Sequence, residues 1–213
     1  MKTVKLTESD LNRIIKKVLF EGDGYSEEWH KEAAKRGLPN IPTTPLALDA
    51  MVTEKAKKLF ETNHVYSHTE LEARHEIELE KYLKKVQIEA RIMGDLALNH
   101  IIPTAIKYQN ELVSNINGLK AVGLPETSYS SQLAILNEVT AHVHVIYTKV
   151  NELVEARKVA NSIESTRERA IAYCSQIKDV YFDEIRYHVD KLEQLVDDEQ
   201  WSLPKYRELL FLR

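Results

Sequence analysis

The sequence predicts an all-α protein, built as a bundle of long antiparallel helices with short capping helices. Only six glycines and six prolines occur among 213 residues, and they cluster at a few positions where helices can end. Between these positions apolar residues recur at steps of three and four, which is the period of an amphipathic helix. No long segment shows the strict alternation of a half-buried strand. Short connections between long helices favour antiparallel neighbours.

Residues 1–21 predict a short amphipathic helix at the N-terminus. The helix is expected to begin after Thr7, because Thr7 and Asp10 resemble an N-cap followed by an acidic first turn. One face of this helix carries the apolar residues Leu11, Ile14, Ile15, Val18 and Leu19. We treat this segment as an element separate from the rest of the chain.

Residues 22–66 predict an irregular connection with short helices. The stretch from Gly22 to Pro45 contains three glycines and three prolines, which interrupt any long helix. Short helices are expected near Ser26–Arg36 and over Ala47–Phe60. We expect the bundle itself to occupy residues 67–213, with residues 22–213 forming one domain.

The first long helix of the bundle is expected to begin at Ser67. Ser67 and Glu70 have the spacing of a capping box, which opens a helix of about thirty residues. Its apolar stripe consists of Leu79, Leu83, Val86, Ala90, Met93, Ala97 and Ile101. Pro103 lacks an N–H and clashes with the preceding turn, so we expect it to break or kink this helix. The continuation is expected to end near Gly118 and Gly123.

One histidine of the long helix is expected inside the bundle. His100 falls on the apolar side of the helix, together with Met93 and Ala97. We therefore expect His100 to be buried or half-buried and hydrogen-bonded to a local partner.

The segment after Pro125 contains the sequence His-Val-His at residues 142–144. Two histidines separated by one residue could bind one metal ion on a strand, where both rings point to the same face. This segment is helical, however, since its apolar residues step by three and four through Leu136, Val139, Val143, Ile146, Val150 and Leu153. Residues two apart lie about 200° apart around a helix axis. His142 and His144 are therefore expected on opposite sides of the Val143 seam, without chelating one ion.

The last third of the sequence predicts helices over Ile163–Ile177 and Val180–Val196 and a short helix near Pro204–Leu212. The only cysteine is Cys174, so no disulfide framework is expected and a reducing compartment is indicated. No apolar run approaches the roughly 18–20 residues of a membrane span, and residues 1–20 lack the apolar region of a signal peptide. These features favour a cytoplasmic protein that does not bind membranes.

The charge pattern argues against a nucleic-acid partner. The net charge is −4, and the pairs of Lys and Arg residues are scattered among acidic residues. Binding to phosphate backbones needs a concentrated basic face. We expect no nucleic acid among the partners.

The main candidate for chemistry is the segment that contains His68, Glu72 and His75. These residues lie at i, i+4 and i+7 on one helix face, and Glu72-x-x-His75 has the spacing used by carboxylate-bridged di-metal bundles. Further ligands for such a centre could come from Glu27, His30, Glu138 and Glu184. Glu and His are also common on solvated helix faces, so a hydrogen-bonded or solvated face is the favoured interpretation.

From residue 22 to the end, the sequence resembles the C-terminal part of type III glutamine synthetase. The matching stretches, in the order of the family, are GDGYSEEW (22–29), KRGLPN (35–40), ARHEIELEKY (73–82), NHIIPTAIKYQN (99–110), EARKVAN (155–161) and DKLEQLVDDEQWSLPKYRELLF (190–211). The last stretch is long and compositionally unusual, which makes the resemblance specific. Residues 1–21 depart from the family.

The resemblance implies a family of ATP-dependent ligases that join glutamate and ammonia, use divalent Mg or Mn, and form large ring-shaped oligomers. The ligands of that family for nucleotide, metal and glutamate lie on strands and loops upstream of the matching region. We therefore carry over no catalytic residue, cofactor site or metal ligand to this chain. ATP and Mg or Mn are implied for the full-length family only, and whether this chain acts as an enzyme stays open.

The expected function is that of a non-catalytic helical module. It would make subunit contacts or support a separate catalytic part, with glutamine synthetase subunits or a second copy of the chain as partners. Aromatic residues are enriched at interface cores, and the candidates are Tyr25, Trp29, Trp201, Tyr206 and Phe211. Packing inside the bundle is the alternative for these five. The alternatives for the whole chain are a stand-alone helical interaction or scaffold protein and, less favoured, a di-metal carboxylate oxidoreductase.

Overall fold

The computed structural model describes residues 7–210 and confirms the all-α prediction. Within this range every regular element is helical, and no strand occurs. The chain divides into two compact units, Met1–Ala47 and Leu48–Arg213. This boundary differs from the expected segment ends at residues 21 and 66, because the short helices that follow residue 48 pack on the long helices of the second unit.

The first unit consists of short helices held by local contacts. Its elements are α1 (Glu8–Val18), α2 (Glu27–Lys35) and the beginning of α3 (Thr44–Leu48). The predicted cap of α1 is present as a capping box, in which Thr7 and Asp10 each accept a backbone N–H from the other. The guanidinium of Arg36, just after α2, donates to the carbonyl oxygen of Leu19 at the end of α1 (2.6 Å). A cation on terminal carbonyls complements the helix dipole, so Arg36 joins the two helices.

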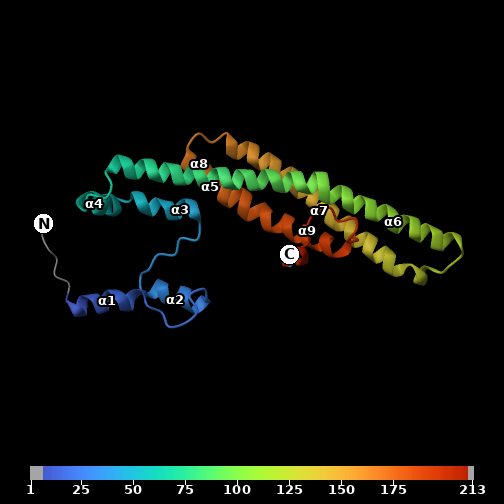
Figure 1. Cartoon of the computed structure of the whole chain (residues 1–213), viewed down its shortest axis with the longest axis horizontal. Helices are drawn as coiled ribbons and strands as arrows, with labels where there is room; N and C mark the ends of the chain where they lie inside the picture. Colours follow the sequence, from blue (N-terminus) through green and yellow to red (C-terminus); the bar gives the residue numbers. More distant parts are fainter. Residues whose placement is uncertain (1–6, 211–213) are drawn as a thin grey trace. The chain divides into compact units, whose positions relative to one another are not determined.

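The second unit contains the bundle. Its elements are η1 (Asp49–Val52), α4 (Glu54–Thr62), α5 (His68–Leu96), η2 (Ala97–Ile101), α6 (Ile102–Ala121), η3 (Glu126–Ser128), α7 (Ser130–Asn161), α8 (Thr166–Ala172), η4 (Tyr173–Phe182), α9 (Asp183–Leu195) and α10 (Tyr206–Leu209). The capping box predicted for Ser67 and Glu70 opens α5. From α5 to α6 the chain forms one long helix, along which α7 returns and α8, η4 and α9 run forward again (Figure 1).

Of the break or kink expected at Pro103, the break does not occur, because α5, η2 and α6 follow one another without interruption. Instead, the hydrogen bonding of this long helix changes to the π pattern over η2, where the Ile102 N–H donates to the carbonyl of Ala97. This wider turn precedes the proline and lets the helix continue past a residue that has no N–H to donate. The same change corrects a second expectation, since His100 lies within η2 and is exposed rather than buried. A π turn holds more residues than an α turn, which rotates positions away from the α period.

The last third of the bundle is also continuous where a break was expected. The sequence predicted two helices, Ile163–Ile177 and Val180–Val196, but α8, η4 and α9 follow one another from Thr166 to Leu195. η4 is π-helical over ten residues. Because π turns change the spacing of buried positions, the apolar period can shift without ending the helix.

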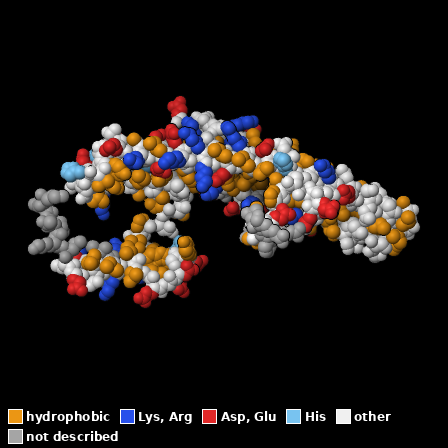
Figure 2. Space-filling view, in the orientation of Figure 1, with side chains coloured by type: hydrophobic (Ala, Val, Ile, Leu, Met, Phe, Trp, Pro, Cys, Tyr) orange, Lys and Arg blue, Asp and Glu red, His pale blue; other side chains and the backbone are white. Residues whose placement is uncertain are grey.

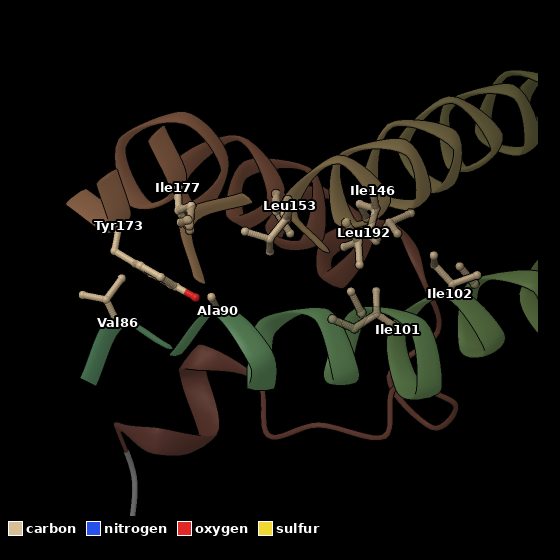
Figure 3. Packing of buried hydrophobic residues seen from close by; sticks show 14 of the residues in the cluster. Val86, Ala90, Ile101, Ile102, Ile146, Leu153, Tyr173, Ile177 and Leu192 are labelled. Carbon is tan, nitrogen blue, oxygen red and sulfur yellow. The ribbon is translucent and has the colours of Figure 1, made fainter. Parts of the chain in front are cut away.

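The core of the bundle lies where the three long helical runs meet (Figure 3). Most of the predicted stripe of α5 and seam of α7 is buried, namely Leu79, Leu83, Val86, Ala90, Ala97, Ile101, Val139, Ile146, Val150 and Leu153. Tyr173 from η4 extends toward Val86 and Ala90 in Figure 3. Its hydroxyl donates to the side-chain oxygen of Asn161 (2.8 Å), which satisfies the polar end of a buried ring. Over residues 7–210, no helix is long and apolar enough to cross a membrane.

Candidate functional site

The three candidate residues of α5 all face the segment that precedes α5, and each has a separate partner. The pairs are His68 Nε2 with Glu61 Oε2 (3.3 Å), Glu72 Oε1 with Lys57 Nζ (2.8 Å) and His75 Nε2 with Asp49 Oδ1 (3.2 Å). We call these three pairs the α5 ladder. The spacing of i, i+4 and i+7 places all three residues on one face, as predicted, and η1 and α4 provide the oppositely charged groups. The α5 ladder therefore joins the short helices to the long one.

Asp49 is the most heavily engaged residue of the α5 ladder. Besides its contact with His75, it accepts a bidentate pair of hydrogen bonds from Arg167 of α8, with Nε at 2.9 Å from Oδ1 and Nη2 at 2.5 Å from Oδ2. The Arg167 guanidinium, followed by the smaller effect of His75, holds the pKa of Asp49 below its usual value. Asp49 thus connects η1, α5 and α8 through one ionised carboxylate.

The middle pair of the α5 ladder is also stabilised in its charged form. The hydrogen bond to Glu72 raises the pKa of Lys57, and the same contact lowers the pKa of Glu72. Both groups therefore stay ionised over a wide pH range. Lys57 also lies 3.7 Å from Glu54, so the Glu72 carboxylate is occupied by a cation of the protein itself and orients α4 against α5.

The other residues named as possible ligands of a di-metal centre have partners of their own. Glu27 pairs with Lys31 (3.6 Å) and His30 contacts Asn40 (3.2 Å), both within the first unit. In the part of the chain that the structure describes, no group of three or more His, Cys, Asp or Glu side chains is arranged to hold a metal ion. The described residues thus do not assemble the di-metal centre. The same described residues also lack a carboxylate cluster of the kind that would hold ATP-bound Mg²⁺.

The His-Val-His motif behaves as the helical period predicts, and one of its histidines has a partner that the sequence did not reveal. His144 is exposed, whereas His142 is half-buried between α7 and α9. The Nδ1 atom of His142 lies 2.7 Å from the Nδ1 atom of His188 on α9. We call these two residues the histidine pair. The residues lie 46 positions apart, so no local spacing could have indicated the contact.

Charged groups flank the histidine pair on both helices. On α7, Glu138 Oε1 lies 3.8 Å from His142 Nε2. On α9, Glu184 stands one turn before His188 and also pairs with Lys149 of α7 (3.4 Å). Burial lowers the pKa of His188, as does the neighbouring His142, while Glu184 acts in the opposite direction. His188 is therefore held toward its neutral form.

An apolar groove lies between α5 and α9 and has a volume of about 470 Å³. Its apolar lining includes Ile88, Ile92, Met93, Val189, Trp201 and Leu203. Three carboxylates and one guanidinium also line the groove, from Glu89, Asp190, Glu193 and Arg186. Ile88 and Ile92 are each more than half exposed, although isoleucine is among the residues most often buried. Hydrophobic side chains are visible among charged ones at the surface of the molecule in Figure 2. We call this feature the α5–α9 groove.

Two of the aromatic interface candidates lie in the first unit and differ in exposure. The side chain of Tyr25 is 95% exposed. Trp29 is half-buried, because its ring packs on Phe20 with 4.8 Å between ring centroids and lies beneath the Arg36 guanidinium. Tyr25 is therefore free to contact a partner, whereas Trp29 already takes part in packing within its own unit.

The other three aromatic candidates lie near the C-terminus. Trp201 is buried in the core of the bundle and lines the α5–α9 groove, and its indole N–H has no hydrogen-bond partner among the described residues. Trp201 thus follows the alternative of packing inside the bundle. The side chain of Tyr206 and the whole of Phe211 lie outside the described part of the structure.

Comparison with known proteins gives a consistent set of relatives. Residues 3–120 match the model of the glutamine synthetase C-terminal domain. Residues 1–21 were expected to depart from the family, but the match includes residues 3–21. Three relatives are glutamine synthetase from Bacteroides fragilis (46% identity over 200 residues, 92% of this chain and 27% of the relative), type-3 glutamine synthetase from Dictyostelium discoideum (34% over 223 residues, 99% and 30%) and glutamine synthetase from Butyrivibrio fibrisolvens (30% over 196 residues, 92% and 28%). The chain spans less than a third of the length of these curated relatives.

Proposed function

The chain belongs to the glutamine synthetase C-terminal domain family, and from this premise we propose that it is a non-catalytic helical module that binds a glutamine synthetase subunit. The family membership confirms the resemblance seen in the sequence. The relatives are glutamine synthetases, and this chain aligns with a minor part of each. In this proposal the ligase reaction belongs to the part of those proteins that the chain does not cover.

The pairing of charged side chains supports a binding role. In the α5 ladder, each of the three α5 side chains contacts its own polar partner on η1 or α4, and Asp49 also binds Arg167. Such pairs fix how helices pack, whereas catalysis with ATP and divalent ions needs several carboxylates that converge on one ion. The side chains of this chain are thus suited to building a rigid scaffold.

The observation that carries the proposal is the α5–α9 groove. Ile88 and Ile92 of α5 are both about half exposed and line this groove, whose volume is about 470 Å³. Concave apolar surfaces of this size are typical places for an anchoring side chain of a partner. Of the charged residues that line the groove, Arg186 and Asp190 pair with each other (2.8 Å), and the carboxylate of Glu89 is a further charged group of the lining. A partner surface with an apolar centre flanked by Lys or Arg would match it.

The proposal can be tested by binding to a truncated synthetase. The Bacteroides fragilis relative would be prepared without the region that aligns with this chain, and the chain would be added as a separate tagged protein. We expect the two to co-elute in size-exclusion chromatography and to be retained together on an affinity resin. The double substitution Ile88→Glu and Ile92→Glu should weaken binding at least about tenfold, because it places two charges in the apolar lining of the α5–α9 groove.

A matched control comes from the same helix. Ile77 of α5 is also half exposed but does not line the groove, so Ile77→Glu should bind like the unchanged chain. Failure of the unchanged chain to associate would contradict the proposal and favour a stand-alone interaction protein. Equal binding by the groove variant would contradict the assignment of the groove as the contact surface.

A further inference from the structure

The histidine pair brings two imidazole ring nitrogens together between α7 and α9. The Nδ1 atoms of His142 and His188 lie 2.7 Å apart, and neither residue is close to the other in sequence. A neutral imidazole has one N–H and one lone pair, so two ring nitrogens reach this distance only when one proton lies between them. If that proton is carried on the other nitrogen of its ring, both Nδ1 lone pairs point at the same small volume.

We propose that His142 and His188 form a binding site for a divalent transition-metal ion, of the class of Zn²⁺, Ni²⁺ or Cu²⁺, which takes the place of the shared proton. Neutral imidazole is a preferred ligand of these ions. When the ion binds, the ring that carries the proton on Nδ1 becomes the Nε2–H form, and each Nδ1 donates its lone pair to the metal. The two rings stay neutral overall, and no oxidation or reduction is involved.

The surroundings of His142 favour the form of the ring that the ion requires. A metal-bound histidine usually directs its second ring nitrogen at a carboxylate, which fixes the proton there. Glu138 Oε1 is 3.8 Å from His142 Nε2, on the side of the ring away from His188. A proton on His142 Nε2 therefore faces a carboxylate, and Nδ1 is left with its lone pair. Glu138 acts in this arrangement as a positioning residue.

The geometry sets the expected strength of the site. Tetrahedral binding with metal–nitrogen bonds of about 2.0–2.1 Å needs about 3.3 Å between the two nitrogens, so the rings must separate by roughly 0.6 Å. His142 is mostly buried, with 13% of its side chain exposed, so the separation has to come from small rotations of both side chains. Among the described residues no third ligand is arranged around this point, so water completes the coordination. We expect weaker binding than in structural zinc sites, which have four protein ligands.

The test is a metal titration of the full chain after treatment with a chelator. Isothermal titration calorimetry with ZnCl₂ and with NiCl₂ should show one saturable site, and the melting temperature should rise as metal is added. His142→Gln and His188→Gln should each weaken binding at least about tenfold, and Glu138→Gln should weaken it by roughly tenfold. His144→Gln provides the matched control, because His144 is exposed two residues away on the same helix, and its binding should be unchanged.

A second measurement keeps the proposal testable if a variant fails to fold. X-ray absorption of the zinc-loaded unchanged chain should show two imidazole nitrogens at about 2.0 Å in the first shell. The absence of saturable binding, a first shell made of oxygen alone, or an equal loss of affinity in His144→Gln would overturn the proposal. None of these outcomes depends on whether the chain binds a synthetase subunit.

Discussion

The α5 ladder and the histidine pair both join separate helices through imidazole side chains, but they balance charge in different ways. In the α5 ladder each of the three α5 side chains contacts a partner of its own on η1 or α4, and successive pairs lie a turn apart on α5. In the histidine pair two identical rings share one proton, and each ring depends on the state of the other. Independent pairs should lose stability additively when they are removed, whereas the members of a shared contact should be coupled. Substitutions at the two sites should therefore differ both in how much stability is lost and in whether the losses add.

The largest effect is expected at Asp49, where one carboxylate serves two partners. Asp49→Ala removes the contacts with His75 and Arg167 together. His75, with only 11% of its side chain exposed, is then left without this partner. We expect the free energy of unfolding to fall by about 2 kcal/mol, which corresponds to a melting temperature lower by roughly 4–8 °C. Urea or thermal unfolding would measure it. Glu76→Ala, at an exposed position beside His75, should change stability by less than about 0.5 kcal/mol.

The same residue predicts a pH dependence of definite sign. The pKa of Asp49 is lowered from its ordinary value of 3.8, mainly by Arg167. Its contribution to stability is therefore present above about pH 4 and is lost as the pH falls through the lower pKa of the folded state. Asp49→Asn should lower stability at pH 7, and the difference from the unchanged chain should shrink toward pH 3. A difference that is constant over this range would show that Asp49 acts through packing alone.

Contacts between residues on one helix could be predicted from the sequence, whereas contacts between separate helices could not. The face that carries His68, Glu72 and His75 follows from the helical period, and the capping box at Ser67 marks the start of that helix. The partners could not be predicted, because they come from η1 and α4 and their register against α5 is a tertiary property. The sequence therefore favoured a hydrogen-bonded or solvated face for these residues, with a metal centre as the alternative, and in the structure they form separate polar pairs.

The histidine pair was harder to predict, because His142 and His188 lie 46 residues apart and a π-helical segment, η4, changes the apolar spacing between them. The period of α7 correctly placed His142 at a seam and kept it apart from His144. His188 follows η4, whose π turns shift the apolar spacing and led to the wrong expectation of two helices. η2 misled the prediction for His100 in the same way. Periodicity thus identified helices and faces well, and it failed where the backbone left the α period.

An intermediate effect is expected when the histidine pair is replaced. His142→Leu or His188→Leu alone leaves the other ring half-buried without its partner, so each should lower the free energy of unfolding by about 1 kcal/mol. The double substitution should cost less than the sum, because it removes both polar partners together. We expect a coupling energy of about 1 kcal/mol from a double-mutant cycle in chelator-treated protein. Simple additivity would mean that the two rings do not share a proton and would remove the contrast with the α5 ladder.

The smallest effect is expected at the outer end of the α5 ladder. His68 and Glu61 form a pair in which both side chains are about half exposed, whereas His75 at the inner end is nearly buried. Exposed ion pairs contribute little, since water screens the charges and two long side chains must be ordered. His68→Ala should lower stability by no more than about 0.5 kcal/mol, and 1 M NaCl should abolish its coupling to Glu61→Ala. If His68→Ala destabilised the chain as much as Asp49→Ala, burial would not set the strength of the ladder, and its pairs could not be treated as independent.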